Sequence, residues 1–119
     1  MRIAILGDGL LGSELHKQTG WDVYSRKKDA IDITDPLSYQ TMLRKYDTII
    51  NCMAYTKTYD PDGAKHWAVN YAAVADLIDW CNYTRKRLVH ISTDYLYAGS
   101  VADAKETDVP VHPRNHYGY

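Results

Sequence analysis

Short apolar runs alternate with amphipathic stretches along this chain, beginning at the N-terminus. Residues 2–6 form an apolar run with β-branched side chains, which is typical of a buried parallel strand. A glycine-rich turn follows. Leu10, Leu11 and Leu15 then recur at near-helical spacing as far as Gly20, a residue type that commonly ends helices. The pattern therefore predicts a strand, a tight turn and a helix.

The same alternation continues to residue 92. Asp35 and Pro36 predict a helix start, because a carboxylate at the N-cap and a proline at the first helical position are both favoured there. Alternating strands and helices predict an α/β fold, a Rossmann-type doubly wound parallel sheet with right-handed crossovers. The remaining predicted elements are a strand over 21–24, the end of the Asp35 helix near Tyr46, a strand over 47–52, a helix over 62–84, a strand over 87–92 and a mostly irregular segment from 94 to 116.

The helix predicted over 62–84 carries an apolar stripe suited to packing on a sheet. Asp62 lies near the positive end of its dipole, where a carboxylate is stabilising. The stripe consists of Trp67, Val69, Val74, Leu77, Ile78 and Cys81.

Length and charge narrow the function classes. The 119 residues predict a single domain over 1–119, and the net charge of −1 argues against nucleic acid or an acidic membrane as a partner. No apolar run is long enough to span a bilayer, and the chain begins on a strand without a signal peptide. Cys52 and Cys81 need no pairing, and the histidines lack metal-ligand spacing. These features predict a cytoplasmic protein without a metal site.

The glycine-rich turn carries the first chemical signal. Gly7, Gly9 and Gly12 form a G-x-G-x-x-G pattern between a predicted strand and a predicted helix. In that context the glycines allow a tight turn, close approach of a pyrophosphate and close packing of the helix on the strand. Dinucleotide binding is favoured over a purely structural turn.

The residues after the second strand bear on which dinucleotide binds. Ser25 and Arg26 are followed by two lysines, where NAD-selective proteins of this fold usually carry an acidic residue. A hydroxyl and cations suit a 2′-phosphate, so NADP(H) is favoured over NAD(H). A solvated basic turn is the alternative, and Asp29 and Asp32 leave NAD(H) open.

Several motifs together resemble a known family. The chain is similar throughout to the extended short-chain dehydrogenase/reductase superfamily, and within it to the dTDP-4-dehydrorhamnose reductase branch. The motifs that carry the resemblance are the glycine turn, Asp32-Ile33-Thr34-Asp35-Pro36, Asn51-Cys52-Met53-Ala54-Tyr55-Thr56, Val69-Asn70, His90-Ile91-Ser92-Thr93-Asp94-Tyr95-Leu96-Tyr97, Glu106-Thr107-Asp108 and Pro113-Arg114-Asn115-His116-Tyr117-Gly118.

The resemblance implies a reductase of a nucleotide-linked keto-sugar and a role for each matching residue. Asn70 would be a structural or proton-relay residue. Thr93 would hydrogen-bond the substrate carbonyl beside Asp94, and Tyr117 would donate or remove its proton. The implied cofactor-binding residues are Gly7, Gly9, Leu10, Leu11 and Gly12 around the pyrophosphate, Ser25 and Arg26 at the adenosine ribose, Asp32 and Ile33 at the adenine, Met53, Ala54 and Tyr55 at the nicotinamide-side ribose, and Ser92.

The resemblance also implies a lysine four residues after Tyr117, which would lower the pKa of the tyrosine. The sequence ends two residues before that lysine, and the C-terminal substrate lobe of the family is absent. Three alternatives follow. The chain is a piece of a longer reductase or epimerase of nucleotide sugars, a stand-alone dinucleotide-binding module without turnover, or a minimal enzyme that completes its site by homo-oligomerisation.

Overall fold

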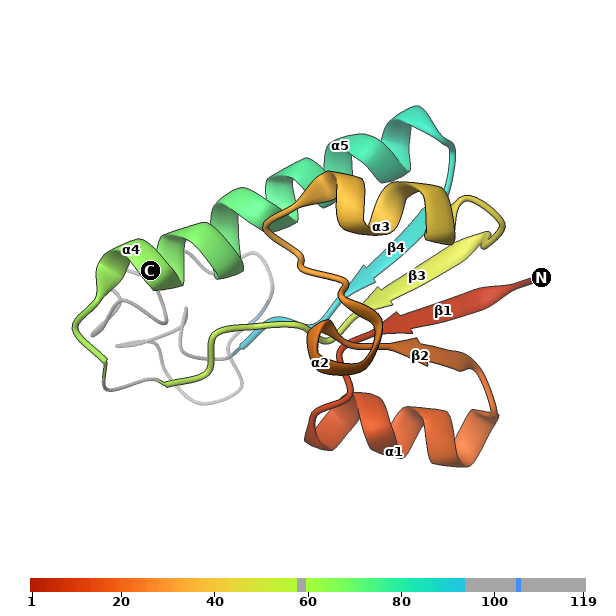
Figure 1. The fold of residues 1–119 in the computed structure, drawn as a ribbon, viewed down its shortest axis with the longest axis horizontal. Coiled ribbons are helices and arrows are strands. Elements are labelled where there is room, and N and C mark those ends of the chain that lie inside the picture. Colours follow the sequence, from red (N-terminus) through yellow and green to blue (C-terminus); the bar gives the residue numbers. More distant parts are fainter. Residues whose placement is uncertain (58–59, 94–104, 106–119) are drawn as a thin grey trace.

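The computed structural model describes residues 1–57, 60–93 and 105. Its described part contains one parallel sheet of four strands in the order β2-β1-β3-β4 (Figure 1). The chain moves from β1 outward to β2 and then crosses back to place β3 on the other side of β1. The predicted Rossmann-type α/β fold is confirmed. The strands are β1 (Ile3–Leu6), β2 (Asp22–Tyr24), β3 (Thr48–Asn51) and β4 (Arg87–His90).

Helices cover both faces of the sheet, as a doubly wound fold requires. Helix α1 lies on one face, whereas α3 and α5 lie side by side on the other (Figure 1). Helix α1 ends where predicted, because Gly20 adopts a left-handed conformation with φ of 73° and its amide donates to the His16 carbonyl. The helical segments are α1 (Leu10–Thr19), α2 (Arg26–Asp29), α3 (Pro36–Leu43), α4 (Gly63–Trp67), the π-helical segment η1 (Ala68–Ala72) and α5 (Ala73–Tyr83).

The main core lies between the sheet and the pair α3–α5. Ala4, Leu6 and Ile49 point into it from β1 and β3, and Leu77 enters it from α5 with no exposed surface. A buried leucine or isoleucine side chain contributes about 1.5–3 kcal/mol to stability relative to an exposed one. The core therefore holds the two central strands in register beneath the helices.

The helix predicted over 62–84 is interrupted. Asp62 does cap its start, accepting hydrogen bonds from the amides of Ala64 at 3.1 Å and Lys65 at 3.3 Å. The chain then passes through the π-helical turn η1, which inserts extra residues per turn and rotates the preceding residues out of phase. Trp67 consequently stays 55% exposed, against the prediction that it packs on the sheet. Ile78, also predicted in the apolar stripe, is 42% exposed on α5.

Helix α3 is shorter than predicted and ends at Leu43 instead of near Tyr46. The Lys86 ammonium, three residues past α5, donates to the carbonyls of Arg44 and Tyr46, at 2.6 Å each. These bonds satisfy terminal carbonyls and stop the helix. Asp35 holds the N-cap position as predicted, but its side chain makes no capping hydrogen bond.

Some predictions lie outside the described residues, namely most of the irregular segment from 94 to 116 and the site residues Asp94 and Tyr117. In the described segments, no helix is long and apolar enough to cross a bilayer. The same segments contain no group of three metal-ligating side chains that could hold an ion. Cys52 and Cys81 both carry free thiols.

Candidate dinucleotide-binding site

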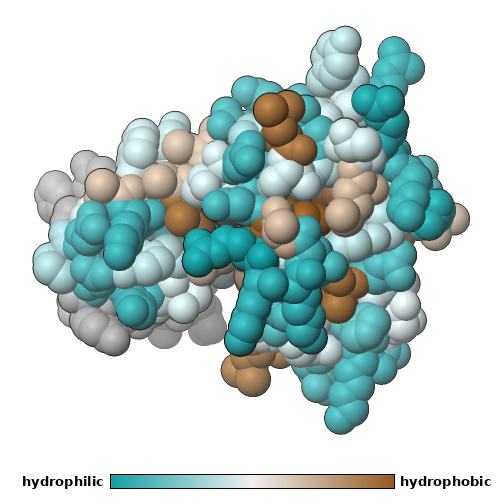
Figure 2. All heavy atoms as spheres, viewed as in Figure 1, coloured by the Kyte–Doolittle hydropathy of each residue, from teal (hydrophilic) through white to brown (hydrophobic). Residues whose placement is uncertain are grey.

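A cavity opens where the strand order reverses. The carboxyl ends of β1 and β3 are neighbours, but the helices that leave β1 and lead into β3 lie on opposite faces of the sheet. Parallel sheets bind ligands in the crevice outside such a switch point. The cavity has a volume of about 670 Å³. Figure 2 shows the surface hollowed beside the hydrophilic side chains over α2.

Residues from six separate segments meet around this cavity. All the residues that the sequence suggested for cofactor binding lie on its wall: Gly7, Gly9, Leu10, Leu11, Gly12, Ser25, Arg26, Asp32, Ile33, Met53, Ala54, Tyr55 and Ser92. Thr93 follows Ser92 directly but is not part of the wall. The structure thus brings the predicted cofactor residues together, whereas two of the three predicted catalytic and substrate residues, Asp94 and Tyr117, lie outside its described part.

The glycine turn forms the floor of the cavity, and its glycines have different roles. Gly7 has φ of 100°, a backbone conformation that favours glycine. A Cβ on Gly12 would lie 1.7 Å from the Gly7 carbonyl oxygen, so the start of α1 packs directly on the turn. A Cβ on Gly9 would meet nothing within 4 Å. Gly9 therefore leaves open space beside the amino end of α1, where backbone amides and the helix dipole favour a phosphate.

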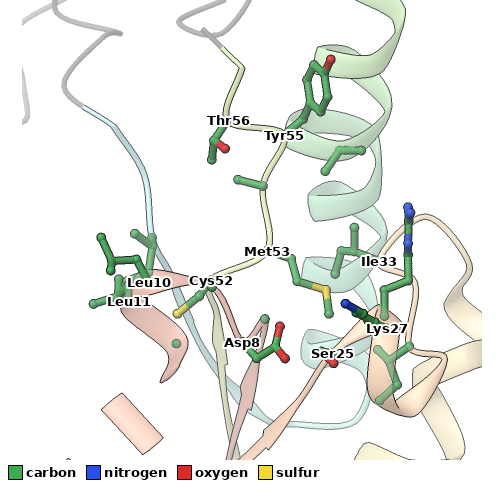
Figure 3. A pocket seen from close by; sticks show the side chains of 18 of the residues that line it. Asp8, Leu10, Leu11, Ser25, Lys27, Ile33, Cys52, Met53, Tyr55 and Thr56 are labelled. Carbon is green, nitrogen blue, oxygen red and sulfur yellow. The ribbon is translucent and has the colours of Figure 1, made fainter. Parts of the chain in front are cut away.

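The end of β2 presents two cations to the cavity. Ser25 is 3% exposed, and its Oγ accepts a hydrogen bond from the Lys28 amide at 3.0 Å. The Asp29 carboxylate accepts one from the Ser25 amide at 2.9 Å. These bonds wind the chain into the single turn α2, which the sequence did not predict. As a result Arg26 and Lys27 lie on the cavity wall, with the Lys27 side chain directed inward in Figure 3.

Asp32 lies farther along the same wall as a firmly ionised carboxylate. It accepts hydrogen bonds from Thr34, at 2.7 Å from the hydroxyl and 2.9 Å from the amide. These bonds, assisted by the Arg26 guanidinium, hold the pKa of Asp32 below its usual value. Its neighbours Ile31 and Ile33 are buried. The segment thus combines an apolar surface with a carboxylate, a combination suited to one edge and one face of a purine ring.

The loop after β3 forms the opposite wall and is held by the interrupted helix. Asn70 lies in η1, and its side chain pairs with the backbone of Tyr55 in both directions. Its Oδ1 accepts from the Tyr55 amide at 2.8 Å, and its Nδ2 donates to the Tyr55 carbonyl at 3.0 Å. The Tyr55 hydroxyl donates to the Asp60 carboxylate and lowers the pKa of Asp60. The π-helical turn therefore positions the Asn70 side-chain amide against the Tyr55 backbone, and this contact holds the loop in place.

Sequence reasoning missed part of the wall. Asp8 lies within the glycine motif, at a position that the motif leaves unspecified. Lys27 belongs to the basic run that the sequence offered for a 2′-phosphate. Cys52 and Thr56 adjoin predicted site residues, and that adjacency was the available signal for these two. Burial raises the pKa of the Cys52 thiol, which fits a packing role. The wall residues that were missed are Asp8, Ile31, Cys52, Thr56, Val69 and Ile91.

The wall residues suit a dinucleotide. The volume lies within the range typical of ligand pockets. Gly9 leaves room for a close backbone approach, and the amino end of α1 suits phosphates. Arg26 and Lys27 supply charge at the β2 side, and Met53 and Ile33 supply apolar surface (Figure 3). Fold and cavity define the class of a Rossmann-type dinucleotide-binding protein.

Comparison with known families narrows the class. The chain belongs to the family described as RmlD substrate binding domain, whose profile matches residues 1–119. The predicted resemblance to the dTDP-4-dehydrorhamnose reductase branch is thereby confirmed. Although the family is described by substrate binding, the matched residues include the glycine turn.

Named relatives agree with this assignment. A dTDP-4-dehydrorhamnose reductase of Mycobacterium tuberculosis is 37% identical over 113 residues, covering 87% of this chain and 36% of that protein. A probable dTDP-4,6-dihydroxy-2-methyloxan-3-one 4-ketoreductase of Streptomyces antibioticus is 33% identical, covering 99% of this chain and 43% of that protein. The crystal structure of dTDP-4-dehydrorhamnose reductase from Bacillus anthracis in complex with NADP superposes with a TM-score of 0.84 at 28% identity, covering 98% of this chain and 45% of that one. The chain thus spans less than half the length of these relatives.

Proposed function

We propose that this chain binds a nicotinamide dinucleotide in the cavity at the carboxyl ends of β1 and β3. The observation that carries the proposal is the open space at Gly9, next to the amino end of α1 and within a wall made of all the predicted cofactor residues. The pyrophosphate would lie over Gly9, Leu10 and Leu11. The adenosine would lie toward Ser25 and Asp32, and the nicotinamide toward the loop after β3.

NADP(H) is the cofactor that we favour over NAD(H). Arg26 and Lys27 both lie on the wall at the end of β2, where the 2′ position of the adenosine ribose lies in this fold. A guanidinium can bind a phosphate through two parallel hydrogen bonds. The relative from Bacillus anthracis was crystallised with NADP, which supports the same preference.

The reaction that we propose for a protein built on this domain is reduction of a nucleotide-linked keto-sugar. Relatives named for reduction of dTDP-linked keto-sugars support this reaction class. Hydride transfer to a ketone builds charge on its oxygen, so an acid must lie within hydrogen-bond reach. Thr93, beside Asp94, would bind that oxygen, and Tyr117 would supply the proton. Tyr117→Phe in a chain as long as the relatives should abolish turnover, and retained turnover would contradict this role.

Calorimetric titration of the chain with NADPH and with NADH tests the proposal. We expect saturable binding of both cofactors, with NADPH the tighter. Arg26→Gln should weaken NADPH binding by about tenfold, the effect of about 1.4 kcal/mol, while changing NADH binding little. Arg87→Gln is the matched control, because Arg87 lies on β4 away from the cavity wall. Binding of neither cofactor to the native chain would overturn the proposal.

A further inference from the structure

Asp8 is a cavity residue whose role the proposed function leaves open. It is the one acidic residue within the glycine motif, residues 7–12. Its backbone carbonyl accepts a hydrogen bond from the Ser13 hydroxyl, which ties the turn to α1. No residue in the described part of the chain donates a hydrogen bond to its carboxylate. Figure 3 shows the side chain directed across the cavity floor toward Ser25.

Hydrogen bonding between β1 and β2 places Asp8 beside the end of β2. The Gly7 amide donates to the Tyr24 carbonyl at 2.7 Å, and Leu6 lies opposite Tyr24 in the sheet register. Asp8, two residues past the end of β1, and Ser25, the residue directly after β2, therefore leave the sheet side by side (Figure 3). In this fold the adenosine ribose lies at the end of the second strand.

The other polar groups at that end of the cavity each already make at least one hydrogen bond within the chain. The Ser25 hydroxyl accepts from the Lys28 amide, and the Asp29 carboxylate accepts from the Ser25 amide. Asp32 accepts two hydrogen bonds from Thr34. In the described residues, Asp8 thus supplies a carboxylate that accepts no hydrogen bond at either oxygen, whereas Asp32 has one oxygen occupied by Thr34 and Asp29 has one occupied by Ser25.

The chemistry of a carboxylate at this place is opposite to that of Arg26 and Lys27. A carboxylate accepts hydrogen bonds from a ribose hydroxyl and repels a 2′-phosphate. We propose that Asp8 is a specificity-determining residue that disfavours the 2′-phosphate and so brings the affinity for NAD(H) close to that for NADP(H). The inference rests on the proposed dinucleotide function. It adds that the Asp8 carboxylate limits the preference for NADP(H) over NAD(H) that Arg26 sets.

The test compares the native chain, Asp8→Asn and Asp8→Ser by calorimetric titration with NADPH and with NADH. Removing the charge should tighten NADPH binding by about fivefold to tenfold, the effect of one charge pair across a solvated cavity. NADH binding should stay the same or weaken by about twofold to threefold. Both Asp8→Asn and Asp8→Ser are measured, so that a local loss of structure in one variant can be recognised by comparison with the other. Glu14→Gln is the matched control, because it removes one negative charge on α1 from a residue outside the cavity wall.

The outcomes separate this inference from the proposed function. A rise in the NADPH-to-NADH affinity ratio in both Asp8 variants, absent in Glu14→Gln, supports the role. Equal tightening of both cofactors would place Asp8 at the shared pyrophosphate and overturn it, as would an unchanged ratio. Failure of the native chain to bind either cofactor would overturn the proposed function and this inference together.

Discussion

Tyr39 and Tyr46 are both buried in the core, and their hydroxyls have different surroundings. The Tyr46 hydroxyl donates to the Asp22 carboxylate and meets the Tyr24 hydroxyl, at 2.5 Å each. In the described part of the chain, the Tyr39 hydroxyl has no hydrogen-bond partner, although its ring packs edge-on against Trp80 at 5.7 Å. Burial raises the pKa of Tyr39 to about 12. A buried polar group without a partner carries its full desolvation cost.

We predict opposite effects of the same substitution at these two residues. Tyr39→Phe keeps the ring and removes the unpartnered hydroxyl, so the free energy of unfolding should rise by about 1 kcal/mol. Tyr46→Phe removes two hydrogen bonds, one of them to a carboxylate, and should lower it by about 1–3 kcal/mol. Urea denaturation of both variants measures the difference. A Tyr39→Phe variant that is as destabilised as Tyr46→Phe would contradict the assignment.

At the scale of elements, different glycines of the turn between β1 and α1 serve the stability of the fold and the proposed cofactor binding. A Cβ on Gly12 would clash with the Gly7 carbonyl oxygen, whereas one on Gly9 would enter open space. Gly12→Ala should therefore destabilise the fold by about 3 kcal/mol or more. Gly9→Ala should keep the native melting temperature and lose cofactor affinity. The pair is checked by thermal melting and titration with NADPH, and full NADPH affinity in a folded Gly9→Ala variant would exclude the pyrophosphate from this turn.

The π-helical turn η1 is the second element with a defined role. Its Asn70 holds the Tyr55 backbone through two hydrogen bonds. Asn70→Ala should lower the free energy of unfolding by about 1–3 kcal/mol and increase amide exchange in the loop over 52–57. Asn82→Ala, an exposed position on α5, is the matched control. Unchanged exchange in the loop would show that other contacts hold it.

Most elements were predictable because local chemistry decides them. The Gly20 helix stop and the start of the helix at Pro36 follow from backbone preferences alone, and the strands follow from their apolar runs. The π-helical turn was not predictable, because its hydrogen bonds leave no signature in composition or spacing. For the same reason Trp67, before the turn, was wrongly assigned to the buried stripe. After the turn Leu77 was assigned correctly, but the adjacent Ile78 was not and is 42% exposed.

The site was predictable in outline and not in detail. The glycine pattern identified its three glycines, but it leaves the residues between them free, and so the place of Asp8 depends on sheet register. The turn α2 depends on the hydrogen bond that the Ser25 side chain accepts from the Lys28 amide, and the basic residues 26–28 do not predict that bond. Such contacts join segments that are distant in sequence, and periodicity describes only neighbours.

At the scale of the whole molecule, the amino ends and the carboxyl ends of the strands have different roles. The amino ends of the strands carry structural contacts, such as the Tyr46–Asp22 pair and the Asp47 carboxylate that accepts from the Arg2 amide at 2.8 Å. The carboxyl ends carry the cavity and every predicted cofactor residue. The described cavity lies within a chain that covers 36–45% of the relatives' length, and dinucleotide binding is the activity that we propose for these residues.

Backbone amide NMR of the chain, recorded with and without NADPH, tests the central claim most directly. We predict that shifts change at the glycine turn, at the end of β2 and in the loop after β3, and that the outer faces of α3 and α5 stay unperturbed. Saturation should follow a single binding curve. Absence of any shift change, or changes confined to α3 and α5, would contradict the claim that the switch point of this sheet is a dinucleotide-binding site.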